Sequence, residues 1–152
     1  MGETYLEDIA VGQTFASEPH AVTSDEIARF CDLSGDFNPL HTDDEAARAA
    51  GFRERIAHGL LVLSVTSGMP TEADDWALNA YLEESRRFVA PVYPGDAIRT
   101  VTRVSEVRRS RSDPGRGIVT TEVEVVNQDG EVVQTGTDVV MVAARTNGGE
   151  TT

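Results

Sequence analysis

The sequence contains a single cysteine, Cys31, and no lysine, so all thirteen of its basic residues are arginines. One cysteine excludes an internal disulfide framework and any zinc site built from several thiolates. The three histidines come without a second cluster of ligands, so we expect no metal site. The net charge of −13 disfavours nucleic acids and anionic membrane surfaces as partners, because their phosphates repel an acidic protein.

Long hydrophobic runs are also missing. The longest, residues 60–65, is far too short to span a bilayer. The first four residues are polar and acidic, unlike the start of a signal peptide. We therefore expect a cytoplasmic protein with no membrane anchor.

The length of 152 residues predicts one domain rather than two. We place this domain at residues 1–145. The last residues, 146–152, are polar and rich in glycine, which predicts a flexible tail.

The first half of the chain is expected to be helical. Thr23 or Ser24 can cap a helix that has Glu26 near its first turn and ends at Gly35. Three carboxylates at residues 43–45 indicate the start of a second short helix, where the helix dipole favours negative charge.

Residues 58–69 are apolar on nearly every side. Periodicity alone does not decide between a buried helix and a buried strand for such a segment. The length of about twelve residues, with small residues on one side, favours a buried helix.

The second half of the chain predicts strands at 76–89, 98–107, 119–125 and 132–143, with polar loops between them. One buried helix followed by a meander of antiparallel strands predicts an α+β fold in which the sheet wraps around a central helix. This is the hot-dog arrangement, although periodicity alone does not separate it from other α+β folds.

One segment, residues 34–41, combines residues that could perform chemistry. Asp36 and His41 lie five residues apart in an expected loop, and Gly35 and Pro39 can turn both side chains toward one pocket. A carboxylate beside an imidazole can hold and activate a water molecule as acid and base, and Asn38 could orient a partner. The alternative is an ordinary loop with a surface histidine, because these residue types are common in turns.

Residues 30–41 resemble the signature of the MaoC-like, (R)-specific enoyl-CoA hydratase family. The resemblance continues through residues 55–60 and 87–96, so it covers most of the chain. It implies a hot-dog fold, usually dimeric, that hydrates trans-2-enoyl thioesters of coenzyme A. Coenzyme A is then part of the substrate, and no separate cofactor is implied.

The resemblance also implies roles for individual residues. The family's catalytic pair falls on Asp36 and His41, and its supporting asparagine falls on Asn38. The backbone N–H that binds the thioester oxygen falls on Gly59. A serine that contacts the catalytic aspartate in some members falls on Ser67, with Ser64, one helical turn earlier, as a weaker candidate.

Other polar residues allow two interpretations. His58 could line the pocket, or it could simply bond to backbone at the start of the helix. The arginines near residues 108–116, or the pair at 86–87, could bind the phosphates of coenzyme A. The alternative for the first group is a solvated hairpin tip.

Two further functions are compatible with a hot-dog fold, because fold does not determine function. The chain could be an acyl-CoA thioesterase, or it could be a non-catalytic subunit that binds acyl thioesters. The complete set of Asp36, Asn38 and His41 argues against both.

Overall fold

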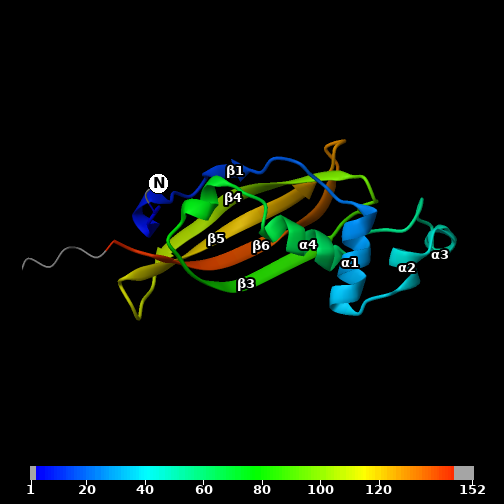
Figure 1. Cartoon of the computed structure of the whole chain (residues 1–152). Coiled ribbons are helices and arrows are strands. Elements are labelled where there is room, and N and C mark those ends of the chain that lie inside the picture. The colour runs from blue at the N-terminus through cyan, green and yellow to red at the C-terminus, as the bar shows by residue number, and fades with distance from the viewer. Residues whose placement is uncertain (1–2, 146–152) are drawn as a thin grey trace, which may run out of the picture.

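A computed structural model describes residues 3–145 and shows a six-stranded antiparallel sheet (Figure 1). The expected tail at 146–152 lies outside this range. The strand order is β1 (Thr14–Ala16), β4 (Ala97–Arg109), β5 (Arg116–Val126), β6 (Val132–Ala143) and β3 (Leu78–Phe88), and β2 (His20–Ala21) also pairs with β4. The predicted strand-rich second half is therefore confirmed.

The helices are α1 (Ser24–Ser34), α2 (Pro39–Thr42), α3 (Asp44–Ala49) and α4 (Gly59–Ser67), with short 3-10 turns η1 (Leu6–Asp8) and η2 (Glu72–Asp75). The first three helices gather at one end of the sheet, and α4 lies between them and the strands (Figure 1). None of the described helices is long and apolar enough to cross a membrane.

The expected ends of α1 are confirmed. Thr23 caps the helix by accepting a hydrogen bond from the Glu26 N–H, and the Glu26 carboxylate bonds back to the Thr23 N–H. The helix ends at Gly35, whose φ of 77° is unfavourable for residues with a side chain. The prediction that Asp36 and His41 share one loop is wrong in part. Asn38 caps the four-residue helix α2, and His41 lies on this helix.

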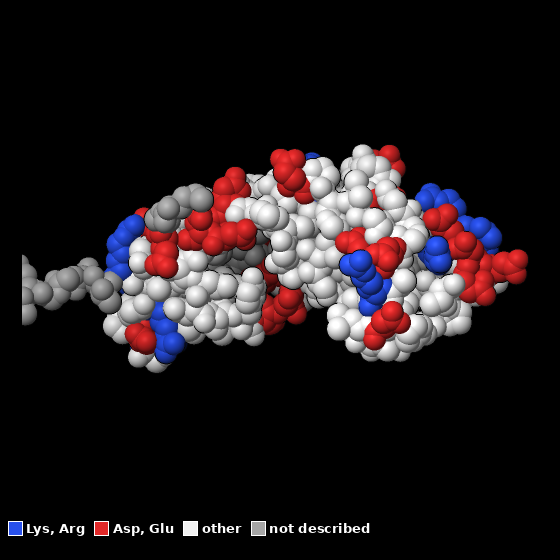
Figure 2. All heavy atoms as spheres, viewed as in Figure 1, with Lys and Arg blue, Asp and Glu red and all other residues white. Residues whose placement is uncertain are grey.

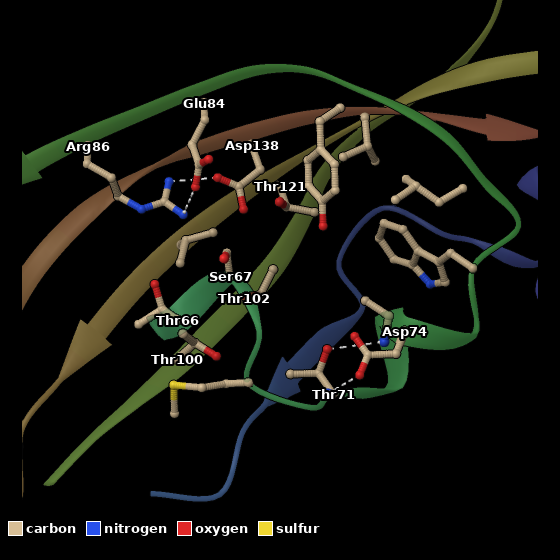
Figure 3. A pocket seen from close by; sticks show the side chains of 17 residues that line it. Thr66, Ser67, Thr71, Asp74, Glu84, Arg86, Thr100, Thr102, Thr121 and Asp138 are labelled. Carbon is tan, nitrogen blue, oxygen red and sulfur yellow. Dashed lines mark hydrogen bonds and ion pairs between the residues drawn. The ribbon is translucent and has the colours of Figure 1, made fainter. Parts of the chain in front are cut away.

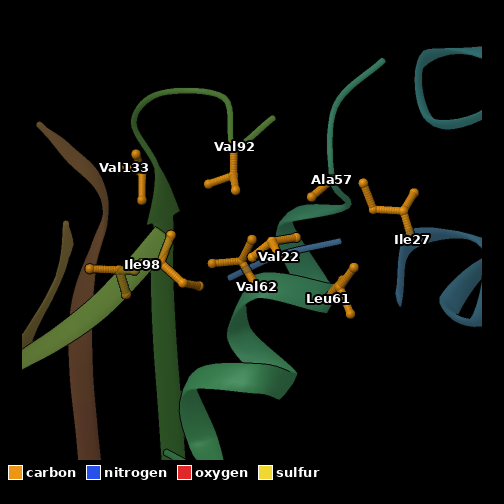
Figure 4. Packing of buried hydrophobic residues seen from close by; sticks show 9 residues of the cluster. Val22, Ile27, Ala57, Leu61, Val62, Val92, Ile98 and Val133 are labelled. Atoms are coloured by element: carbon orange, nitrogen blue, oxygen red, sulfur yellow. The ribbon is translucent and has the colours of Figure 1, made fainter. Parts of the chain in front are cut away.

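The core forms where α4 packs against the sheet (Figure 4). Leu61 and Val62 of α4 belong to one core cluster with buried residues of β4, β5 and β6, namely Ile98, Val125 and Val133. This arrangement confirms the α+β hot-dog fold. The helix is nevertheless shorter than expected, at Gly59–Ser67. It is also buried on one side only, since Leu60 is 58% exposed.

The surface combines scattered acidic residues with an apolar sheet edge. Figure 2 shows Asp and Glu spread over the visible face around a broad uncharged area. Strand β3 is the last strand of the sheet. It exposes several large apolar side chains, among them Tyr81, Leu82 and Phe88.

Candidate active site

The Asp36 carboxylate is held by its own loop. The backbone N–H of Asp36 donates to Ser34 Oγ at 3.1 Å, and the backbone N–H of Asn38 donates to Asp36 Oδ1 at 3.1 Å. These bonds leave the second oxygen, Oδ2, free to face His41. The side chain is half-exposed, so solvent can reach it.

The His41 ring is oriented by one backbone bond. Nδ1 lies 2.8 Å from the carbonyl oxygen of Ile56. A carbonyl only accepts, so this bond assigns the proton of the neutral ring to Nδ1 and leaves the lone pair on Nε2. Nε2 lies 3.8 Å from Asp36 Oδ2. That separation is too long for a direct hydrogen bond, but both atoms are within reach of one water molecule.

His58 links the two segments that carry this pair. It precedes α4, is 2% exposed, and its Nε2 lies 3.0 Å from the carbonyl oxygen of Asp36. Its ring stacks on His41 with centroids 3.7 Å apart, and the edge of Phe30 packs against it at 4.8 Å. His58 therefore positions both members of the pair, a role that the sequence left open between pocket lining and an ordinary helix start.

The surroundings of His58 favour its neutral form. Burial lowers the pKa of its ring below the usual range, and the nearby His41 acts in the same direction. Its Nε2–H donates to the Asp36 carbonyl, while its buried Nδ1 has no partner among the described residues. Burial also raises the pKa of the neighbouring Cys31 thiol, so this cysteine is a buried packing residue and not a reactive thiolate.

Gly59 supplies the first N–H of α4. Helices leave their first backbone N–H groups without internal partners, and within residues 3–145 the Gly59 N–H donates no hydrogen bond. Gly59 and His41 line the same pocket, whose volume is about 270 Å³. An unpaired donor and an imidazole thus border one cavity, most of whose other lining residues are apolar.

The ring of Phe88 lies directly beside Gly59. A Cβ at position 59 would approach Phe88 Cε2 to 2.7 Å and two further ring atoms to 2.8 Å. Every larger residue at this position therefore requires Phe88 to move. This contact explains why position 59 holds a residue without a side chain. The expected approach of a thioester is a second reason.

The side chains of the remaining candidates make no hydrogen bond to the pair within the described residues. The Asn38 side chain accepts from the Leu40 N–H at 3.0 Å and so caps α2; only its backbone contacts Asp36. The hydroxyl of Ser64 donates to the carbonyl of Leu60, and that of Ser67 donates to the carbonyl of Ser64. Within the described chain neither serine hydroxyl bonds to Asp36.

Ser67 instead faces a second cavity, at the C-terminal end of α4, whereas the first pocket is lined by residues at the start of this helix (Figure 3). This cavity is lined by hydroxyl groups and by the buried Arg86, which pairs with Asp138 at 2.6 Å and Glu84 at 3.0 Å. Arg86 is therefore already neutralised by two carboxylates, which argues against phosphate binding by this arginine, one of the two alternatives considered for the phosphates.

The arginine loop between β4 and β5 lies at the end of the sheet opposite α1–α3 (Figure 1). Its side chains pair locally, Arg109 with Glu7, Arg108 with Glu106, and Arg116 with Asp113. These observations favour the solvated hairpin tip over a phosphate site.

Three side chains could be considered for a metal ion. Asp36, His41 and His58 offer ligand atoms that lie within 4.8 Å of one another. A metal ion binds an imidazole nitrogen through the lone pair that lies in the plane of the ring. Because the rings of His41 and His58 are stacked, their lone pairs lie in nearly parallel planes. The arrangement thus suits a bound water better than a shared ion.

Comparisons with known proteins show the family of the chain. The profile of the MaoC like domain family matches residues 8–127. An (R)-specific enoyl-CoA hydratase from Rhodospirillum rubrum is 33% identical over 141 residues, covering 93% of each chain.

Solved structures agree as well. The structure of a protein from Archaeoglobus, described as a monoamine oxidase regulatory protein, is 34% identical, with a TM-score of 0.87 over 96% of this chain and 98% of that one. A Mycobacterium tuberculosis protein described as a double hot-dog fold is 22% identical, with a TM-score of 0.83 over 96% of this chain and 46% of that one, and supports the fold alone. The chain therefore belongs to the MaoC-like dehydratase family of hot-dog hydro-lyases, which act on acyl thioesters.

Proposed function

We propose that this chain is an (R)-specific enoyl-CoA hydratase that also runs in reverse as a 3-hydroxyacyl-CoA dehydratase. The observation that carries the proposal is the 3.8 Å separation of the acceptors Asp36 Oδ2 and His41 Nε2. His41 lines one pocket together with Gly59, whose N–H is unpaired within residues 3–145, while Asp36 lies beside His41 outside that pocket's lining. The (R)-specific hydratase from Rhodospirillum rubrum, similar over nearly its whole length, supports the same activity.

Asp36 and His41 together hold the reacting water. Both Asp36 Oδ2 and His41 Nε2 are acceptors, so one water can donate a hydrogen to each. The pair takes one proton from this water while its oxygen forms a bond to Cβ of the enoyl thioester. The pair then returns the proton to Cα, so one water supplies both groups from one face and the addition is syn.

The Gly59 N–H stabilises the charge that this reaction creates. As hydroxide adds to Cβ, electrons move from the double bond onto the thioester oxygen. An unpaired N–H at a helix start is suited to that oxygen, because the helix dipole favours negative charge there. One such donor is typically worth roughly 3 kcal/mol of activation free energy.

Incubation with crotonyl-CoA tests the proposal against its alternatives. Hydration removes the enoyl absorbance without releasing thiol, which is the expected result. Release of free coenzyme A would instead identify a thioesterase. Binding of crotonyl-CoA, and of longer enoyl-CoAs, with no turnover would identify a non-catalytic subunit.

A further inference from the structure

Gln134 is an unusual residue for its position in β6. It is 2% exposed and sits beside the valine-rich core that includes Val133 and Val125. Buried polar side chains cost free energy unless all their polar atoms are paired. A glutamine here therefore requires an explanation that packing does not supply.

A shift in strand register turns Val133 inward beside Gln134, which shares one face of β6 with the buried Val140 and Val142. Val125 pairs with Gln134, but Val126 pairs with Val132, so Val133 is an extra residue on β6. Such bulges re-aim side chains and occur often beside active sites. As a result, Val133 and Gln134 are both buried although they are neighbours on one strand.

One half of the Gln134 amide is committed. Nε2 donates to the carbonyl oxygen of Gly59 at 2.9 Å, and because that carbonyl only accepts, the amide orientation is fixed. The other half is free: Oε1 is buried and has no partner among the described residues. Gln134 lines the same pocket as His41, Gly59 and Phe88, so the residue that carries the unused acceptor is bonded to the residue whose N–H is assigned to the thioester oxygen.

We propose, resting on the hydratase function above, that Gln134 is a substrate-binding residue whose Oε1 accepts a hydrogen bond from the amide N–H of the substrate's pantetheine arm. An unpaired acceptor requires a donor. The enoyl group and the thioester carry no N–H or O–H. The donor nearest to them is the amide N–H that follows the short carbon link from the sulfur.

Two small crotonyl thioesters isolate this hydrogen bond. The N-acetylcysteamine thioester keeps the amide N–H, and the 2-acetoxyethyl thioester replaces that N–H by an ester oxygen of similar size. A pocket built to bind a donor rejects the analogue without it, because its acceptor stays unpaired. The wild-type protein should prefer the amide by on the order of tenfold or more in kcat/KM.

Gln134→Met removes both polar atoms at similar volume. It should bring the preference for the amide to within about twofold. Any loss that acts only through Gly59 affects both thioesters equally and cancels in this ratio. Gln134→Leu serves as a second variant if the first has a much lower melting temperature, and Thr135→Val, the next residue on β6 and outside the pocket lining, should keep the wild-type preference.

The binding affinities of the corresponding butyryl thioesters, which cannot be hydrated, give the same comparison of amide and ester. The hydratase activity and the binding role of Gln134 can then fail separately. Suppose that the wild-type protein hydrates crotonyl-CoA, but that the Gln134→Met variant prefers the amide thioester as strongly as the wild-type protein does. This result overturns the role of Gln134 and leaves the proposed hydratase activity intact. Suppose instead that the wild-type protein binds the amide form of the butyryl thioester more tightly, that Gln134→Met abolishes this preference, and that the wild-type protein hydrates no crotonyl-CoA. This result supports the binding role of Gln134 and overturns the hydratase activity. No preference in either assay overturns the role of Gln134.

Discussion

At the scale of single residues, the bond from His41 Nδ1 to the Ile56 carbonyl decides which nitrogen can meet a water. It leaves the Nε2 lone pair beside Asp36. The bond from His58 to the Asp36 carbonyl and the stack of His58 on His41 hold both residues in place. The reactive geometry therefore depends on three backbone-anchored residues from two segments.

Replacement of Asp36 or His41 should remove most of the activity. Asp36→Asn and His41→Gln are each expected to lower the turnover of crotonyl-CoA by on the order of 10²- to 10⁴-fold, because each removes one of the two groups that handle the proton. The double variant should be little worse than either single one, since both groups serve one step. Steady-state kinetics measure these losses.

Asp32→Asn, which changes an exposed carboxylate at the end of α1, is the matched control and should keep normal turnover. Losses that multiply in the double variant would show that Asp36 and His41 act on separate steps. Near-normal turnover in His41→Gln would also contradict the assignment.

Sequence patterns reveal some of these residues and not others. The Asp36–His41 segment could be identified because its residues are close in sequence. His58 carries no such signal, since a lone histidine before an apolar run looks the same whether it packs or positions a site. Gln134 was missed because glutamine is usually exposed, although this one alternates in phase with the buried Val140 and Val142 of β6.

At the scale of elements, the start of α4 is set against the end of β3. Gly59 begins the helix and the Phe88 ring lies against it, a contact between residues distant in sequence that no local pattern predicts. By contrast, the ends of α1 could be predicted from Thr23, Glu26 and Gly35, because caps are local. The four-residue helix α2 was missed because so short a helix has no periodicity.

Gly59→Ala should abolish most hydration. A second substitution shows whether the added methyl group blocks the thioester or only displaces the Phe88 ring. If the thioester needs the space beside Gly59, then Gly59→Ala combined with Phe88→Ala should stay far less active than Phe88→Ala alone. Crotonyl-CoA kinetics of the four proteins measure this. Equal activity of Phe88→Ala and the double variant would show that the added methyl group acts only by displacing the Phe88 ring.

At the scale of the whole molecule, stability should depend on pH through His58. Its folded pKa lies below 6.5 because of burial, whereas in the unfolded chain it titrates near 6.5. Below pH 6.5 the unfolded chain therefore binds a proton that the folded chain does not. The contribution of His58 is complete above pH 6.5 and is lost as the pH falls toward the folded pKa.

Urea unfolding between about pH 7.5 and pH 5.5, one unit on each side of the ordinary histidine pKa, measures this effect. The unfolding free energy should fall on acidification, with His58 contributing at most about 1.4 kcal/mol per pH unit. His58→Gln should show a shallower fall. An unchanged slope in that variant would contradict a neutral, buried His58.

The exposed edge of the sheet predicts a homodimer. Strand β3 has no partner on its outer side within the described chain, and unpaired edges that are apolar tend to be covered. Light scattering at micromolar concentration should give the mass of two chains. Leu82→Glu, which charges an exposed leucine on β3, should weaken the dimer, and a monomeric wild-type protein would contradict the prediction.

The central claim is that one water, held by Asp36 and His41, supplies both the hydroxyl and the proton. Hydration of crotonyl-CoA in D₂O, followed by analysis of the product's configuration, tests it most directly. We predict a 3-hydroxyl group of R configuration with the new deuterium added at Cα on the same face as the oxygen. Deuterium on the opposite face, or a product of S configuration, would contradict the account.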